Sequence, residues 1–435
     1  MASLSPEGLV LQRDGHRGQT LLSVGLTFSL DDVDYLRSES GAAALREVAE
    51  LPLTDATRVA DTAAVRARFG ARAAVLVETT LLRRRAADKL AGLEDISDWL
   101  FTDEALQQAT VASVALHRAR RLAGLVVHDV TCSIGTELAA LRSTASRVVG
   151  SDIDPVRLQM ARHNLGLPDG RVDLCRADAL HPVTRDAAVV VDPARRSSGR
   201  RRFNPADYQP GLGPLLDTYR RRDLVVKCSP GIDFDQVGRL GFDGEIEVTS
   251  YRGSVREACL WSAGLAGPGV RRRASVLDHR GQVTQITSAE PDDCPVRPAG
   301  RWIVDPDGAI VRAGLVRHYG ARHGLWQLDP DIAFLSGDRL PQGERGFEVL
   351  EQLAFDERRL RQALIRLDCG ALEILVRGVG VDPDVLRRRL RLRGSRPLSV
   401  VIARIGSGAT SRATAFLCRS LAVTPRYADG DYQCN

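Results

Sequence analysis

The chain has 435 residues, more than one hydrophobic core usually supports, so two or three domains are expected. Hydrophobic residues make up 44% of it and charged residues 26%, a balance that excludes a largely disordered or collagen-like protein. No run approaches the roughly 20 apolar residues that a membrane-spanning helix needs, and the first residues do not have the pattern of a signal peptide. We therefore expect a cytoplasmic protein without membrane contact.

The formal net charge of +5 is mild, but the ratio of arginine to lysine is unusually high. Lys89 and Lys227 are the only lysines, which leaves 58 arginines among the 60 basic residues. A GC-rich genome produces this bias without functional pressure, whereas arginine binds phosphate bidentately wherever it clusters, so the position of a cluster matters more than the total. The eight cysteines do not have the spacing of a zinc site, so we expect no metal.

The first part of the chain reads as helical. Residues 1–27 show no sustained period and are expected to form a flexible lead-in. Residues 28–122 place apolar side chains at three- and four-residue spacing, which predicts an N-terminal helical region. One helix start is well marked, with Thr102 as N-cap and Asp103 and Glu104 in the first turn, opening a helical run to Arg121.

From residue 123 short apolar runs alternate with helical stretches. They predict strands at residues 125–130, 147–154, 171–178, 187–194, 223–230, 245–251 and 257–263. Strands separated by helices pair in parallel, so residues 123–264 predict a doubly wound, mostly parallel α/β sheet, a Rossmann-like core. The last two runs lie close enough together to form an antiparallel hairpin at the edge of this sheet.

The remaining chain predicts a linker over residues 265–273 and a second α+β unit over residues 274–420. This unit has helical patterns at residues 356–367 and 382–391 and strands at residues 371–377 and 398–404. Residues 421–435 are expected to be a frayed tail.

A tight loop between the first strand and its helix carries the strongest chemical signal. Asp129 ends the first strand and Asp152, 23 residues later, ends the second. In doubly wound sheets the ligand lies beyond the carboxyl ends of the strands, where an acidic residue ending the second strand accepts hydrogen bonds from ribose hydroxyls. Asp178 ends the third predicted strand, where it can meet the amino group of an adenine.

The loop also discriminates between adenosine-bearing cofactors. Its sequence, T-C-S-I-G-T, contains the single glycine Gly135 and so does not have the G-x-G-x-x-G pattern that cradles a pyrophosphate. The carboxylate of Asp129 would repel phosphate but suits a cation. S-adenosylmethionine has an ammonium and a sulfonium and no phosphate, so the loop favours this cofactor over NAD.

These motifs resemble a known enzyme family. The segments D-V-T-C-S-I-G-T, V-V-G-S-D-I-D-P-V-R-L-Q-M-A-R-H-N, R-A-D-A-L and V-V-V-D-P-A-R resemble class I S-adenosylmethionine-dependent methyltransferases. Within that superfamily the chain is similar to RNA methyltransferases near trimethylguanosine synthase, which place an F-T-x-E-like helix start before the domain, here F-T-D-E. W-I-V-D-P-D-G-A-I-V-R-A-G (302–314) and I-L-V-R-G-V-G-V-D-P-D-V-L-R-R-R-L (374–390) resemble the THUMP-like domain attached to such enzymes in bacteria.

The resemblance implies roles for particular cofactor-site residues. Asp129, Thr131 and Gly135 would line the methionine end of the cofactor, with Cys132 shaping the same loop. Asp152 would hold the ribose, Ile153 would pack on the adenine, and Asp178 would meet its amino group. Asp154 is expected instead to cap the helix that opens at Pro155.

The corner after the fourth strand, Asp192-Pro193-Ala194-Arg195, faces the methyl group in this superfamily. Asp192 and Pro193 are the expected catalytic residues, and Arg195 is expected to orient substrate phosphate or base. The chain departs here from the usual N/D/S-P-P-aromatic pattern, because Ala194 and Arg195 replace the second proline and the aromatic residue that stacks on a flipped base. Cys228 is an alternative, as the nucleophile that uracil-C5 methyltransferases need.

An arginine-rich segment follows the corner directly. It predicts substrate contacts because basic groups interleaved with aromatic side chains suit a nucleic acid: Arg196, Arg200, Arg201, Arg202, Phe203 and Tyr208. Phe203 or Tyr208 is expected to supply the missing stacking ring. We therefore expect an S-adenosylmethionine-dependent methyltransferase of a base in RNA, tRNA or rRNA. Methylation of DNA or a small molecule, or RNA binding without catalysis, remain alternatives.

Overall fold

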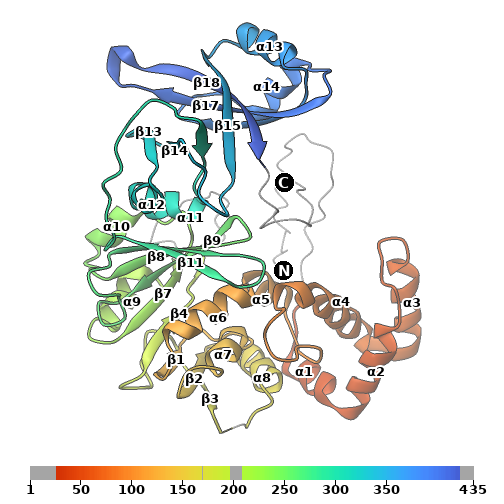
Figure 1. The fold of residues 1–435 in the computed structure, drawn as a ribbon. Coiled ribbons are helices and arrows are strands. Elements are labelled where there is room, and N and C mark those ends of the chain that lie inside the picture. Colours follow the sequence, from red (N-terminus) through yellow and green to blue (C-terminus); the bar gives the residue numbers. More distant parts are fainter. Residues whose placement is uncertain (1–25, 169, 196–207, 422–435) are drawn as a thin grey trace, which may run out of the picture.

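The computed structural model describes residues 26–168, 170–195 and 208–421 of the chain. The expected lead-in, most of the tail, and Arg196, Arg200, Arg201, Arg202 and Phe203 lie outside these residues. Within them the chain forms an N-terminal group of helices and two β-sheets, with α11 and α12 between the sheets (Figure 1).

The N-terminal region is helical, as its periodicity predicts. Its helices are α1 (Leu30–Arg37), α2 (Glu39–Ala49), α3 (Arg58–Phe69), α4 (Ala73–Lys89), α5 (Asp103–Gln108) and α6 (Ala112–Arg121), with a 3₁₀ turn at Gly70–Arg72. Thr102 caps α5, its hydroxyl accepting the Ala105 N–H at 3.1 Å. The predicted run to Arg121 is interrupted at residues 109–111, where Ala109 and Val111 are extended and the β-branched Thr110 and Val111 weaken helix propensity.

The first sheet confirms the predicted α/β core. Its described strands run in the order β11-β10-β8-β9-β7-β4-β1-β2-β3. They are β1 (Val126–Asp129), β2 (Arg147–Asp152), β3 (Val172–Arg176), β4 (Ala188–Val191), β7 (Leu224–Cys228), β8 (Glu245–Tyr251), β9 (Ser254–Trp261), β10 (Arg272–Leu277) and β11 (Val283–Thr287). The neighbours from β3 through β7 are parallel. Helices α7 (Thr136–Leu141), α8 (Pro155–Asn164), α9 (Leu212–Thr218) and α10 (Phe234–Arg239) connect strands, and β5 (Ala194–Arg195) pairs with β6 (Tyr208–Gln209) apart from the sheet.

The hairpin expected at the sheet edge forms but is not at the edge. Strands β8 and β9 pair antiparallel, β9 also pairs with β7, and β8 is covered on its other side by β10. Strand β10 begins inside the expected linker and runs parallel to β8, so the first sheet extends to residue 287. The buried side chains of Ala274 and Leu277 explain why this segment joins the sheet.

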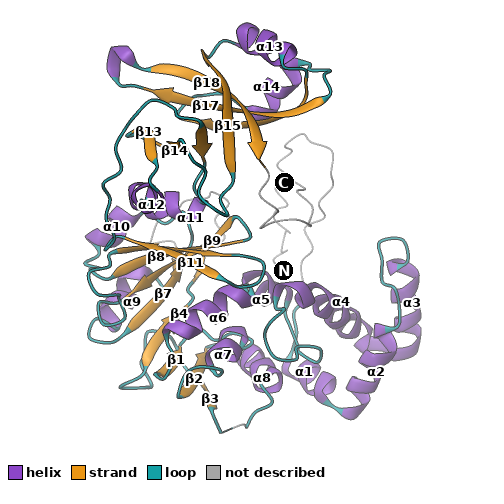
Figure 2. Cartoon of the chain, viewed as in Figure 1, coloured by secondary structure: helices purple, strands orange, loops and turns teal. Residues whose placement is uncertain are grey.

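The second sheet lies beyond α11 (Gly308–Ala313) and α12 (Val316–His323), with strands in the order β13-β14-β12-β15-β18-β17-β16 (Figure 2). They are β12 (Trp302–Val304), β13 (Trp326–Asp329), β14 (Ile332–Gly337), β15 (Gly346–Ala354), β16 (Cys369–Arg377), β17 (Arg396–Ile405) and β18 (Arg412–Leu421). The helices α13 (Glu357–Arg366) and α14 (Pro383–Leu390) match the predicted helical patterns to within a residue at each end.

Apolar cores join the parts of the molecule. One cluster unites the N-terminal helices with one side of the first sheet, and a second unites the other side with α11 and α12. Two further clusters belong to the second sheet. Among the described helices, none combines the length and apolar character needed to cross a membrane.

Candidate active site

A pocket of about 570 Å³ lies at the carboxyl ends of the parallel strands β1 to β4. The chain leaves β1 for β2 on one side and later reaches β4 on the other, and such a switch point is where doubly wound sheets bind ligands. The lining includes the predicted cofactor residues Asp129, Thr131, Cys132, Asp152, Ile153 and Asp178. The structure therefore brings together residues spread over fifty positions of the sequence.

Gly135 shapes the loop without lining the pocket. It precedes α7 with a φ of 89°, a left-handed conformation that favours glycine. A Cβ at this position would lie 3.2 Å from Leu165 Cδ1, so the residue also allows a close approach between the loop and α8.

Hydrogen bonds hold the loop between the ends of β1 and β2. Asp129 Oδ1 accepts the Thr131 N–H at 3.0 Å, and Asp152 Oδ2 accepts the Ser133 N–H at 2.9 Å. Asp152 Oδ1 accepts the Asp154 N–H at 2.9 Å. Asp154 itself caps α8 as predicted, its carboxylate accepting from two backbone N–H groups. Each oxygen of Asp152 can accept a further bond, so the carboxylate can still hold a ligand hydroxyl.

Asn164, which the sequence analysis did not single out, ties the loop to the N-terminal region. Its side chain accepts the Leu100 N–H at 2.7 Å and donates to the carbonyls of Leu100 and Ile134 at 3.0 and 2.9 Å. Asn164 is buried, so these bonds are protected from water. The sequence signal that could have identified Asn164 is its place as the last residue of the methyltransferase-like motif that begins at Val148.

The carboxylate of Asp129 is placed to receive a cation. Burial, followed by the neighbouring charge of Glu137, raises the pKa of Asp129 to about 7. A bound ammonium or sulfonium would favour the ionised form and lower this pKa. Ile153, which lines the same pocket, is 62% exposed and offers an apolar surface that a planar ring can cover.

Asp178 lines the same pocket from the end of β3. Its Oδ1 accepts the Leu180 N–H at 2.8 Å, and its side chain remains about half exposed. A carboxylate, an exposed apolar side chain and a second carboxylate at Asp152 thus follow one wall. This set of groups fits an adenosine with a cationic tail.

Asp192 follows β4 and faces the pocket from the other side of β1. Its backbone N–H donates to Thr131 Oγ1 at 2.7 Å, which links this corner to the cofactor loop. Its Oδ2 accepts from Lys227 Nζ at 2.5 Å. Pro193 is buried, and Arg195 lies in β5.

Lys227 was missed as a site residue by the sequence analysis, although it is one of two lysines in the chain. It lies on β7 and is only 7% exposed. Burial alone would lower the pKa of Lys227, but Asp192 and Glu137 raise it above its ordinary value. Its Nζ lies 3.8 Å from Glu137 Oε2, so the ammonium bridges two carboxylates.

The ion pairs continue into the N-terminal region. Arg118 of α6 donates to both carboxylate oxygens of Glu137, at 2.7 and 3.0 Å, and to Glu257 of β9. Arg118, Glu137 and Glu257 are all buried. A chain of ion pairs therefore runs from the buried Arg118 of α6 through Glu137 and Lys227 to the exposed Asp192.

A second pocket, of about 510 Å³, adjoins the first at Asp192. Asp192, Ala194, Lys227, Gln108 and Ala109 line both pockets. Its remaining lining is mostly polar and comes from the α5–α6 junction, the end of α4, the corner after β4, β6, the end of β7 and β9: Lys89, Gln107, Thr110, Val111, Pro193, Tyr208, Cys228, Ser229, Arg256 and Glu257.

Tyr208 does not provide the stacking surface that the sequence suggested. It is 4% exposed, and its hydroxyl accepts the Ser229 N–H at 2.8 Å. Although Tyr208 reaches the lining of the second pocket, so little of it is exposed that its ring does not offer an open stacking surface. Cys228 is likewise buried, at the end of β7. In the described part of the chain, no cluster of His, Cys, Asp and Glu side chains is arranged to hold a metal ion.

Comparison with known proteins identifies the family. Two proteins of Mycobacterium tuberculosis, from strains CDC 1551 and H37Rv, are each 77% identical to this chain over 358 residues, which is 82% of this chain and 99% of theirs. Both are described as uncharacterized S-adenosylmethionine-dependent methyltransferases. This chain therefore belongs to the S-adenosylmethionine-dependent methyltransferases, which confirms the resemblance and the expected enzyme class.

Two segments match described domain families, and one solved structure covers almost the whole fold. Residues 344–420 match the family described as THUMP domain-like, which confirms a domain of this kind and includes residues 374–390 but not 302–314, and residues 29–86 match a domain of unknown function. A crystal structure from Porphyromonas gingivalis W83, assigned as a methyltransferase, has a TM-score of 0.70 and 20% identity over 91% of this chain and 100% of that one. This similarity confirms the fold.

Proposed function

We propose that this methyltransferase transfers the methyl group of S-adenosylmethionine to a base in RNA, in the cytoplasm, with Asp192 at the point of transfer. The observation that carries the proposal is that Asp192 and Lys227 line both pockets. A cofactor in the first pocket and an acceptor in the second would meet at this pair.

The first pocket holds the cofactor in this proposal. Asp129 and Thr131 receive the charged methionine end, and Asp152 receives the ribose hydroxyls. Ile153 and Asp178 contact the adenine ring and its amino group, while Cys132 and Gly135 shape the loop. When bound, the cofactor supplies an electrophilic methyl group.

Asp192 positions the acceptor. The ammonium of Lys227, 2.5 Å away, pairs with the Asp192 carboxylate and fixes its orientation. An ionised carboxylate accepts a hydrogen bond from an N–H of the acceptor, which turns the nitrogen lone pair toward the first pocket. Positioning of this kind supplies much of the rate of a bimolecular transfer.

Three features support RNA as the acceptor. The second pocket is lined by Lys89, Lys227 and Arg256 and is polar, which suits a nucleotide. The sequence following β4 is rich in arginine. Residues 344–420 match the THUMP domain-like family, and a separate domain of this kind allows contact with a large substrate.

The experiment that tests the acceptor class uses purified enzyme, methyl-labelled S-adenosylmethionine and total nucleic acid plus small molecules from a strain without the gene. The proposal predicts label in a macromolecular fraction that RNase removes and DNase does not. Label resistant to RNase, or label in the small-molecule fraction, would contradict the RNA assignment. Cofactor binding with no label in any fraction would contradict catalysis.

A further inference from the structure

The second pocket contains both lysines of the chain. Lys89 comes from the last turn of α4 and Lys227 from β7, while 58 other basic residues of the protein are arginines. Arg256 of β9 lines the same pocket. Three cations from three elements far apart in sequence therefore converge on one space next to the proposed methyl-transfer corner. The carboxylates of Asp192 and Glu257 line the same pocket, which leaves one positive charge in excess.

Lys227 and Lys89 differ in their partners. Lys227 is bridged between two carboxylates. Lys89 Nζ instead donates to the carbonyls of Leu106 and Gln107, at 2.7 and 2.8 Å, at the end of α5. An ammonium has three donors, so this geometry fixes Lys89 and leaves one donor for a ligand.

The charge of Lys89 and Arg256 is not balanced by protein carboxylates. Across residues 26–168, 170–195 and 208–421, no carboxylate oxygen lies within 4.0 Å of either side chain, whereas the nearby Arg85 pairs with Asp103 at 2.6 Å. Burial lowers the pKa of Lys89, and the charges of Lys227, Arg256 and Arg85 lower it further. An anion in the pocket would relieve this repulsion.

Building on the proposed function, we infer that the second pocket binds a phosphate group of the acceptor nucleotide in an RNA strand through Lys89 and Arg256. In an RNA strand the ribose that carries the base is also linked to a phosphate, so the two groups reach a protein surface together. The second pocket, at about 510 Å³, has the volume of a small-ligand site. The base would then extend toward Asp192, which lines the same pocket. The N-terminal helical region, through α4 and the α5–α6 junction, thus forms part of the acceptor site.

The two lysines allow a direct test by NMR. Enzyme labelled with [ε-¹³C]lysine carries two side-chain signals, and the variant Lys89→Arg identifies the one from Lys89. The pH midpoint of Lys89 is measured in free enzyme and with adenosine, adenosine 5′-monophosphate or a single-stranded RNA hexamer. The readout needs no turnover, so it is independent of whether RNA methylation is detected.

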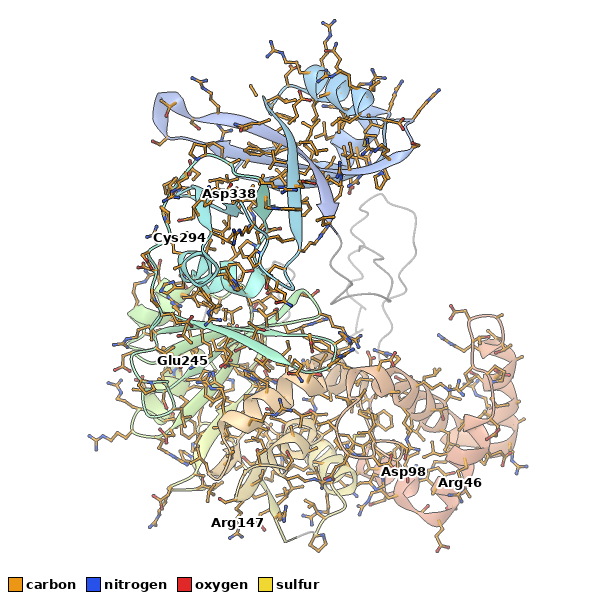
Figure 3. All side chains as sticks on the ribbon, in the orientation of Figure 1. Arg46, Asp98, Arg147, Glu245, Cys294 and Asp338 are labelled. Atoms are coloured by element: carbon orange, nitrogen blue, oxygen red, sulfur yellow. The ribbon has the colours of Figure 1, made fainter. Side chains whose placement is uncertain are left out.

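We expect the nucleotide and the RNA to raise the Lys89 midpoint by about one pH unit, because an anion favours the charged amine, and adenosine to leave it unchanged. Arg256→Gln should raise the midpoint in free enzyme, since a like charge is removed, and should reduce the response to RNA. Arg46→Gln is the matched control, because Arg46 lies exposed on the N-terminal helices, away from the first sheet and its Glu245 (Figure 3). This variant should change neither the Lys89 midpoint in free enzyme nor its response to RNA.

Three results would overturn the inference. A Lys89 midpoint that is the same with and without RNA would exclude the phosphate contact. A response to the mononucleotide without a response to RNA would show that the pocket takes a free nucleotide. Loss of the RNA response in Arg46→Gln as well as in Arg256→Gln would assign it to overall charge.

Discussion

At the scale of single residues, the site depends on charges that the fold has removed from water. Asp129 is 3% exposed and lies near Glu137 and Asp192, so three carboxylates share one region with the single ammonium of Lys227. Ionisation of Asp129 is therefore unfavourable unless a cation is bound. Such perturbed carboxylates are more typical of binding sites than of hydrophobic cores.

The pKa of Asp129 predicts how folding stability depends on pH. It is about 7 in the folded protein against an ordinary value of 3.8, so the protonated form stabilises the fold, and this contribution is lost as the pH rises from about 4 through 7. Asp129→Asn keeps the neutral form at every pH. We expect it to raise the free energy of unfolding at pH 8 by up to about 4 kcal/mol and to have little effect at pH 4. Denaturant unfolding at both pH values checks this, and an equal effect at pH 4 and pH 8 would contradict it.

Lys227 should set the pH at which the cofactor binds. Because the ionised form of Asp129 receives the cation, affinity for S-adenosylmethionine should rise as the pH passes about 7. The charge of Lys227 lowers the pKa of Asp129, so Lys227→Met should move this midpoint upward by about one unit. Lys227→Arg keeps the positive charge and is the control, so it should not change the pH midpoint of cofactor binding. Calorimetric titrations between pH 6 and pH 9 measure both, and a fixed midpoint in Lys227→Met would show that the two groups are not coupled.

At the scale of elements, the site is formed where helices of the N-terminal region meet the loops of the first sheet. The buried Asn164 joins the loop containing Ile134 to Leu100, and Arg118 of α6 fixes Glu137 at the start of α7. These contacts make α5 and α6 part of the active site, although they precede the sheet in sequence.

Asn164→Ala should loosen the cofactor loop. The substitution leaves the Leu100 N–H and the carbonyls of Leu100 and Ile134 without partners in a buried place, and we expect a loss of about 2–4 kcal/mol in the free energy of unfolding. Affinity for S-adenosylmethionine should fall as well, because the loop carries Thr131. Arg162→Ala, at an exposed position of the same helix, is the control. An Asn164→Ala protein of unchanged stability would contradict this role.

The sequence predicted the elements better than the contacts between them. Asp129 and Asp152 could be found because each ends a strand of a known pattern, and Asp154 because a cap is a local signal. Lys227 and Glu137 could not, since their roles depend on which strands and helices become neighbours. The burial of Tyr208 could not be predicted for the same reason, because it depends on packing beside β7.

At the scale of the whole molecule, one hydrophobic core includes residues from both sides of a domain boundary that the sequence predicts. The cluster shared by the first sheet with α11 and α12 includes Val248, Ala274 and Ile310, which lie on both sides of the expected linker. Arg312 of α11 also donates to the Pro230 carbonyl at 2.6 Å, next to the second pocket. The methyltransferase core therefore depends on residues well beyond 264.

A truncation series should reveal this dependence. A chain ending at residue 264 loses β10, β11 and α11, which leaves Val248 and its neighbours exposed along β8, so we expect it to aggregate or to unfold without cooperativity. A chain ending at residue 343 keeps this cluster but separates β12 from β15, so we expect it to bind the cofactor and to be less stable than the full chain. Thermal unfolding and cofactor titration distinguish the two, and a stable 1–264 fragment would contradict the argument.

The measurement that tests the central claim most directly compares wild-type enzyme with Asp192→Ala in the transfer of labelled methyl groups to RNA, with the cofactor affinity of both proteins measured alongside. The account predicts that Asp192→Ala binds S-adenosylmethionine with affinity within about threefold of wild type but transfers at least a hundredfold less label, because removing a positioning contact in the transition state costs on the order of 3 kcal/mol. Undiminished RNA methylation by Asp192→Ala would contradict it.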